Sequence, residues 1–134
     1  MNRSIAIFTI VVPDYDAGID FYVSALGFEL LEDTPRGPGK RWVRVAPPGA
    51  ETAILLAKAD GPAQTAAIGN QTGGRVGFFL HTDDFERDYQ AMKAKGVVFK
   101  EEPRHEVYGS VVVFKDVAGN LWDLLGPAPT ASAG

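Results

Sequence analysis

Residues 14–27, DYDAGIDFYVSALG, have a counterpart at residues 83–96, DDFERDYQAMKAKG. Asp14 or Asp16 can cap the first turn of one helix, and Asp83 or Asp84 that of the other. Each stretch ends, 13 residues after its first aspartate, with a glycine suited to the position after a helix. Apolar residues recur between these ends at helical spacing: Ile19, Tyr22, Val23 and Leu26 in the first stretch, and Phe85, Tyr89 and Met92 in the second. The sequence therefore predicts the same helix twice.

The segments around the two helices repeat as well. An apolar, strand-like segment precedes each helix, at residues 5–12 and 76–82. Three more strand-like segments follow each helix: 28–32, 41–46 and 52–58 in the first half, and 97–101, 110–115 and 121–125 in the second. This order predicts an α+β fold in which two βαβββ modules, about residues 3–58 and 75–126, form a cupped mixed sheet.

The rest of the chain fits one small domain of residues 1–126. The polar, glycine-rich residues 59–74 are expected to form a flexible connector between the modules, and residues 127–134 a frayed tail. The fraction of hydrophobic residues, 46%, is enough to build a core in a chain of 134 residues.

Composition excludes several classes of function. The chain has no cysteine, so disulfides, thiol catalysis and Cys-ligated metals are ruled out. A net charge of −4 without a basic stripe argues against a nucleic-acid partner. No apolar run approaches the roughly 18 residues that a membrane span needs, and the N-terminus, MNRSIAIF, lacks the apolar region of a signal peptide. We expect a cytoplasmic protein with no membrane partner.

Several short motifs carry a family resemblance. VPD at residues 12–14, FY at 21–22 and LGF at 26–28 resemble the first-module signature of the vicinal oxygen chelate superfamily, which includes glyoxalase I, bleomycin-resistance proteins and extradiol dioxygenases. Tyr108-Gly109 and residues 114–124, FKDVAGNLWDL, are similar to the closing hairpin of that superfamily. The resemblance covers residues 3–126 and implies the fold more specifically than the reaction.

In metal-dependent members of the superfamily, four inward side chains, usually His, Gln or Glu, bind one divalent metal. The matching positions in this sequence are Ile7, Leu55, either Val76 or Gly77, and Asp123. Only Asp123 can donate a lone pair, and one carboxylate does not hold a divalent cation. We therefore expect no cofactor, and a divalent metal only at an atypical site, for instance one where His105 turns inward to join His81 and Asp123.

His81 and Asp123 are the candidate catalytic residues. By strand alternation His81 shares a face with Gly77 and Phe79, where it could shuttle a proton or bind a ligand. Asp123 could act as a general base or anchor a cationic ligand. The alternatives are a strand histidine bonded to a neighbour and a carboxylate in a structural ion pair, with Arg44 as a possible partner.

The candidate ligand-binding residues are mostly aromatic: Trp42, Arg44, Phe79, Tyr108 and Trp122. Trp42 and Arg44 share one face of a strand and suit a planar or anionic ligand, although a strand tryptophan can equally belong to a core or a dimer interface. Tyr108 could close over a ligand or pack on the sheet. Asn70 and Gln71 are either connector or ligand contacts, and His105 is expected in a solvated loop.

Two functions remain open. The first is a metal-free protein of the bleomycin-resistance type that binds a small molecule in the cavity of the cupped sheet, in a homodimer. The second is a lyase or dioxygenase of the glyoxalase type, with an atypical metal site or with metal-free acid–base catalysis by His81 and Asp123.

Overall fold

A computed structural model describes residues 1–128 of the chain. The first module builds a four-stranded sheet in the order β1-β4-β3-β2, in which β1 and β4 are parallel and the other pairs antiparallel. Its elements are β1 (Ile7–Val12), α1 (Tyr15–Ile19), a π-helical continuation η1 (Asp20–Ala25), β2 (Glu29–Pro35), β3 (Arg41–Ala46) and β4 (Ala53–Lys58). Of the two candidate caps, Asp14 and Asp16, it is Asp14 that caps α1 through its side chain.

The second module repeats this order in the sheet β5-β9-β8-β6, again with one parallel pair, β5 with β9. Its elements are β5 (Phe78–His81), α3 (Phe85–Ala94), β6 (Val98–Phe99), β7 (Arg104–Glu106), β8 (Gly109–Lys115) and β9 (Leu121–Gly126). Asp84 is the residue that caps α3. The α+β class and the two repeated modules are thus confirmed, with one mixed sheet for each module.

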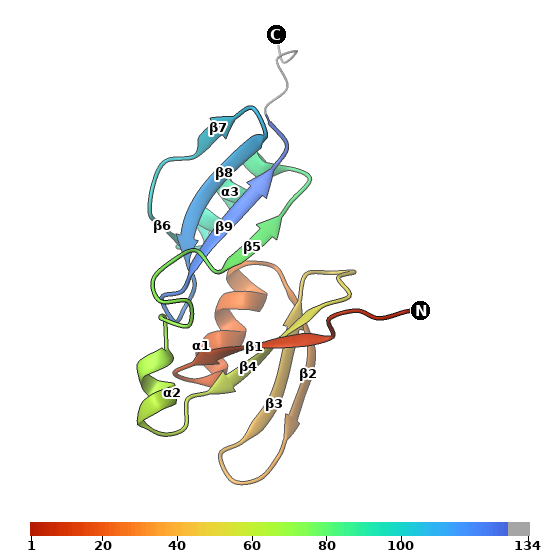
Figure 1. Cartoon of the computed structure of the whole chain (residues 1–134), viewed down its shortest axis with the longest axis vertical. Helices are drawn as coiled ribbons and strands as arrows, with labels where there is room; N and C mark the ends of the chain where they lie inside the picture. The colour runs from red at the N-terminus through yellow and green to blue at the C-terminus, as the bar shows by residue number, and fades with distance from the viewer. Residues whose placement is uncertain (129–134) are drawn as a thin grey trace.

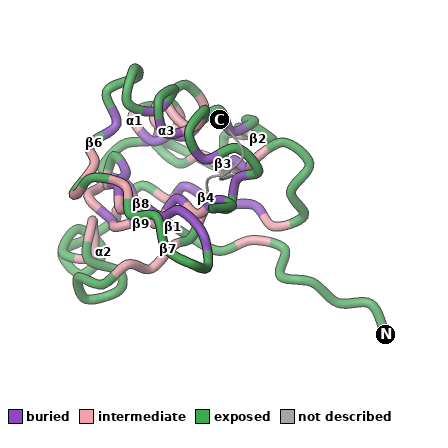
Figure 2. Tube along the Cα trace, turned by 90° about the horizontal axis from the view of Figure 1, so that it is seen from above, coloured by how far each residue is buried: buried purple, intermediate pink, exposed green. Residues whose placement is uncertain are grey.

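Helices cover one side of each sheet. Figures 1 and 2 show α1 and α3 together on one side of the strands, and the two modules meet there. The buried side chains of both modules form one cluster around Tyr22, which is fully buried and lies 5.8 Å from Trp122 between ring centroids. At the neighbouring edges of the sheets, Phe8 on β1 stacks on Phe78 of β5 at 5.9 Å.

The structure corrects three local expectations. The connector of residues 59–74 contains a short helix, α2 (Pro62–Ala67), which starts with proline in its first turn. The strand expected at 28–32 extends to Pro35, because Asp33 and Thr34 still pair with β3 beyond an irregularity between Leu30 and Glu32. His105 belongs to β7 instead of a loop, since its strand pairs with β8.

Candidate functional site

Each sheet has a face that no helix of residues 1–128 covers, which we call the open face. On β3, Val43 and Val45 are fully buried toward the helices, whereas Trp42 and Arg44 are half-buried on the open face. Nε of Arg44 donates a hydrogen bond of 3.0 Å to Oε1 of Glu32 on the neighbouring strand. This bond lowers the pKa of Glu32 and holds the guanidinium in one direction.

The open face of the second sheet carries Phe79, His81 and Asp123. Phe79 is 62% exposed and pairs in register with Asp123 of β9, while His81 pairs with Leu125. His81 and Asp123 therefore share a face on adjacent strands, two positions apart in register. The structure therefore places the two side chains on one face, but within residues 1–128 no hydrogen bond joins them.

Asp123 is the most unusual side chain of this face. Its Oδ1 is buried and has no hydrogen-bond partner among the residues that the structure describes. Burial raises the pKa of Asp123; the positive charge of Arg104 opposes this effect and the negative charge of Glu101 adds to it. Arg104 itself is hydrogen-bonded to Glu101 at 3.2 Å. A buried acceptor without a donor is costly, so this oxygen is suited to receive a donor from a bound molecule.

Arg44, considered as a possible partner for Asp123, pairs with Glu32 instead. The arginine whose charge acts on Asp123 is Arg104, which sequence reasoning did not single out. The pairing of β7 with β8 brings it near, because Arg104 lies in register with Val111. The run of charged residues around Arg104 was visible in the sequence. The strand that places Arg104 near Asp123 is only three residues long, so its pattern gave no strand signal.

Trp122 and Tyr108 lie in different environments. Trp122 is 3% exposed and points into the core, where its Nε1 donates a hydrogen bond of 3.2 Å to Oδ2 of Asp116. It therefore lies on the opposite side of β9 from Asp123. Tyr108 is 70% exposed at the turn before β8 and does not pack on the sheet.

His105 faces away from the other candidates. Its Nδ1 lies 2.7 Å from Oγ of Ser110, and its ring meets Phe85 edge-on at 6.2 Å, on the helix side of the sheet. It cannot complete a metal triad with His81 and Asp123 in this arrangement. Within residues 1–128, no three His, Cys, Asp or Glu residues are placed to hold a metal ion.

The family's metal positions do not fit a metal in this chain. Leu55 lies on the open face of β4, where alternation also places Ile7 of β1, and neither has a donor atom. At the third position, Val76 has no donor atom in its side chain and Gly77 has no side chain. Asp123 remains the one donor of the set.

The connector has a structural role that the sequence did not reveal. Gln71 accepts a hydrogen bond of 2.6 Å from the backbone N–H of Val11 and donates one of 3.1 Å to the carbonyl of Thr9. β1 is an edge strand, so its outer backbone groups need partners. Gln71 is thus used by the protein itself, which argues against the ligand contact considered for it.

The fold and the open faces define a class of protein built from paired βαβββ modules. The model of the Glyoxalase/Bleomycin resistance protein/Dioxygenase superfamily matches residues 4–124, and the chain belongs to this superfamily. An uncharacterised protein of Shewanella frigidimarina is 53% identical over 127 residues, which cover 93% of this chain and 94% of that protein.

Two solved structures are similar over nearly their whole length. UcmS2 is 30% identical, with a TM-score of 0.81, over 93% of this chain and 98% of that one. TnmS3, an antibiotic binding protein from Streptomyces sp. CB03234, is 32% identical, with a TM-score of 0.76, over 95% of this chain and 98% of that one. No helix within residues 1–128 is long and apolar enough to cross a membrane.

Proposed function

We propose that this protein is a cytoplasmic binding protein that holds a small organic molecule on the open faces of its sheets without a metal. The observation that carries the proposal is the buried Oδ1 of Asp123, which has no hydrogen-bond partner among residues 1–128 and lies on the open face beside the exposed ring of Phe79. A ligand that donates a hydrogen bond to this oxygen would satisfy it, and the ring supplies apolar contact.

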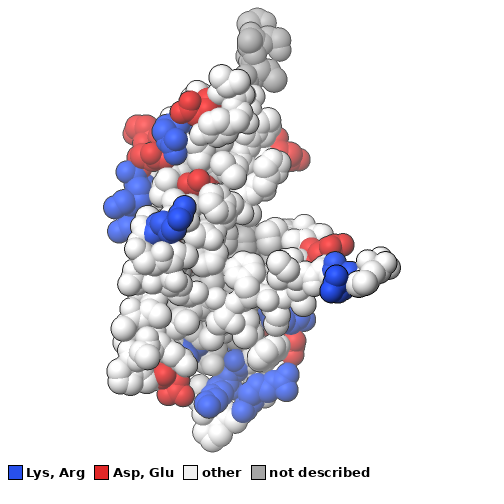
Figure 3. Space-filling view, viewed as in Figure 1, with Lys and Arg blue, Asp and Glu red and all other residues white. Residues whose placement is uncertain are grey.

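The first sheet contributes complementary chemistry. The guanidinium of Arg36 lies over the ring of Trp42 at 5.6 Å from the centroid, so a ligand would stack on the opposite face of the ring. Arg44 offers guanidinium donors that Glu32 keeps in place. Arg44 suits a ligand that carries a hydrogen-bond acceptor, and Asp123 suits a ligand that carries a donor. Figure 3 shows a largely uncharged surface over the middle of this side of the molecule, as expected for an apolar ligand site.

A second copy of the chain would complete the site. Phe79 and Tyr108 are 62% and 70% exposed, so a molecule bound to one chain alone would stay in contact with water. Pockets for small molecules bury most of their ligand. A homodimer that covers the open faces would enclose it, and sedimentation velocity would then give a mass of two chains.

The similarity to TnmS3, an antibiotic binding protein, guides the choice of compounds. A thermal-shift screen of aromatic antibiotics should find at least one that raises the melting temperature, and titration calorimetry of that compound measures its affinity. Asp123→Asn and Arg44→Gln should each weaken binding about tenfold. Arg75→Gln is the control, because Arg75 is an exposed residue that directly follows the connector. Equal affinity in all variants would contradict the site.

An enzyme that uses His81 and Asp123 as an acid–base pair is the second candidate. The two residues share a face, and burial raises the pKa of Asp123, which favours a carboxyl group that can hold and release a proton. Mass spectrometry of the bound compound distinguishes the two functions. Recovery of the unchanged compound supports binding, whereas conversion that stops in both His81→Ala and Asp123→Asn assigns an enzyme.

A further inference from the structure

A cavity of about 510 Å³ lies at one end of the first module, apart from the open-face candidates. It is lined by the tip of the β2–β3 hairpin, the end of β4, the start of α1, and α2: Tyr15, Pro38, Gly39, Lys40, Lys58, Ala59, Asp60 and Gln64. Its volume falls in the range of roughly 300–1,000 Å³ that is usual for small-molecule sites. These segments are distant in the sequence, so no local motif predicts the cavity.

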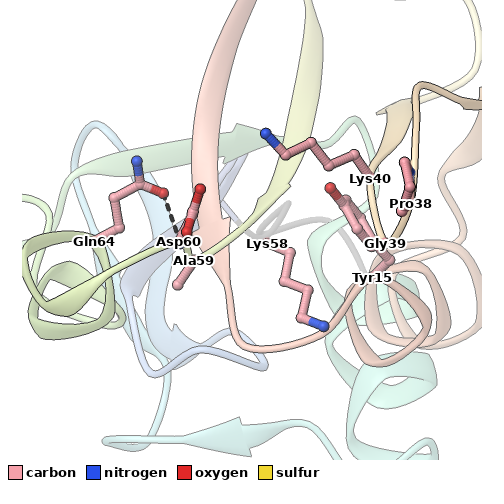
Figure 4. Close-up of a pocket in the computed structure, with 8 residues that line it drawn as sticks. All are labelled: Tyr15, Pro38, Gly39, Lys40, Lys58, Ala59, Asp60 and Gln64. Carbon is pink, nitrogen blue, oxygen red and sulfur yellow. Dashed lines mark hydrogen bonds between the residues drawn. The ribbon is translucent and has the colours of Figure 1, made fainter.

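Tyr15 places a polar hydroxyl group at this cavity. The residue is only 8% exposed. The guanidinium of Arg41 lies over the Tyr15 ring, 5.2 Å from the ring centroid. Its hydroxyl forms no hydrogen bond with any residue within 1–128, and Figure 4 shows it pointing toward the side of the cavity where Lys40 lies. A hydroxyl without a hydrogen-bond partner among residues 1–128, on a mostly buried ring beside a cavity, is a ready donor for a ligand oxygen.

Two lysines supply positive charge at the same cavity. The ion pairs within residues 1–128 all use arginine, so the ammonium groups of Lys40 and Lys58 have no carboxylate partner there. Figure 4 shows them entering from different elements, with Asp60 set apart beside Gln64, whose side chain accepts the N–H of Asp60 at 2.8 Å. The lining therefore carries two positive charges and one negative charge, in a chain whose net charge is −4.

We propose that this cavity is a second binding site, for a small organic anion that carries carboxylate or phosphate groups. The oxyanion accepts hydrogen bonds from the hydroxyl of Tyr15 and the ammonium of Lys40, and Lys58 attracts the ligand from across the cavity. Figure 3 supports the charge argument, since Lys and Arg gather at the end of the molecule that carries the β2–β3 hairpin. Because the chain as a whole repels anions, localised binding requires a specific site.

The test is an NMR titration of the ¹⁵N-labelled full chain with sodium phosphate and with sodium succinate, at constant ionic strength. The uncharged succinamide controls for effects other than charge. We expect saturable shifts of the backbone amides of Lys40, Ala59 and Gln64, with a dissociation constant on the order of 1–10 mM for such small probes. If only phosphate saturates the shifts, the ligand carries a phosphoryl group. If only succinate does, the ligand carries a carboxylate, and if both do, the site accepts either group.

Variants separate this site from general attraction of anions. Lys40→Gln and Lys58→Gln should each weaken binding at least fivefold, and Tyr15→Phe about threefold with both lysines in place. Lys100→Gln makes the same charge change at an exposed lysine of the second module and should leave the affinity within twofold. Linear shifts without saturation, shifts of equal size with succinamide, or equal losses in Lys100→Gln would overturn the proposal.

Discussion

The hydroxyl of Tyr22 donates a hydrogen bond of 2.6 Å to Oδ2 of Asp116, and this buried bond joins the helix of the first module to the last hairpin of the second. The other oxygen of Asp116, Oδ1, accepts three backbone N–H groups at 2.9 Å, those of Ala118, Gly119 and Asn120. Burial raises the pKa of Tyr22 well above its usual range, with the charge of Asp116 adding to the effect. The tyrosine therefore stays protonated and can always donate.

Tyr22→Phe should destabilise the protein by about 1–3 kcal/mol, because it removes one hydrogen-bond donor from the buried side chain of Asp116. Urea unfolding followed by circular dichroism measures the change. Tyr89→Phe is the matched control: Tyr89 is also buried, and its hydroxyl has no hydrogen-bond partner within residues 1–128, so the loss there should be below about 0.5 kcal/mol. Equal losses in the two variants would contradict the role assigned to the Tyr22 bond.

Asp123→Asn should change how stability depends on pH. Since burial raises the pKa of Asp123, the folded protein keeps that proton to a higher pH than the unfolded chain does. The contribution of Asp123 to stability is thus full in acid and falls as pH rises through the raised pKa. The asparagine variant should be more stable than the original at pH 7, with the difference shrinking toward pH 4.

Melting temperatures measured between pH 4 and pH 8 test this expectation. Glu102→Gln removes an exposed carboxylate of the same module and serves as the control. If the difference between Asp123→Asn and the original protein stayed constant across this range, the burial of the carboxylate would have no thermodynamic effect and the expectation would be wrong.

Gln71→Ala should loosen the outer edge of β1. The variant loses the acceptor for the N–H of Val11, so hydrogen exchange at this amide should speed up about tenfold, the factor that corresponds to ~1.4 kcal/mol. Gln90→Ala removes a glutamine whose bond to Glu86 lies on the surface of α3 and should leave the exchange of Val11 unchanged. Unchanged exchange in Gln71→Ala would show that β1 does not depend on this side chain.

Trp42 should report ligand binding by its fluorescence. Of the two tryptophans, Trp42 lies on the open face and Trp122 is buried in the core, so a ligand on the open face should quench the first alone. Trp42→Phe should abolish the ligand-dependent change and weaken binding three- to tenfold in calorimetry, since a smaller ring remains for stacking. A full fluorescence change in Trp42→Phe would place the ligand elsewhere.

The repeated fold could be predicted because its signals are local. A capping aspartate, an apolar stripe and a closing glycine lie within 14 residues of each other, and each was visible twice. Strand alternation also separated Trp42 and Arg44 from Val43 and Val45, and the structure confirms that separation. These features depend on spacing along the chain alone.

The remaining features depend on contacts between distant segments. The pairing of Gln71 with β1 spans about 60 residues, and the effect of Arg104 on Asp123 requires the short strand β7. His105 lies on the helix side because β7 pairs with β8 in one register, and a shift of one residue would turn it to the other face. A single sequence gives no signal for such register.

Native mass spectrometry of the full chain tests the central claim most directly, because one spectrum shows bound compound, bound metal and the number of chains. The protein is incubated with Ni²⁺, Zn²⁺, Fe²⁺ and Mn²⁺ and with a compound from the thermal-shift screen, and is then desalted. We expect a dimer that retains about one compound per chain and no divalent metal. About one metal per chain, lost in Asp123→Ala, or a chain that retains no compound would contradict a metal-free binding protein.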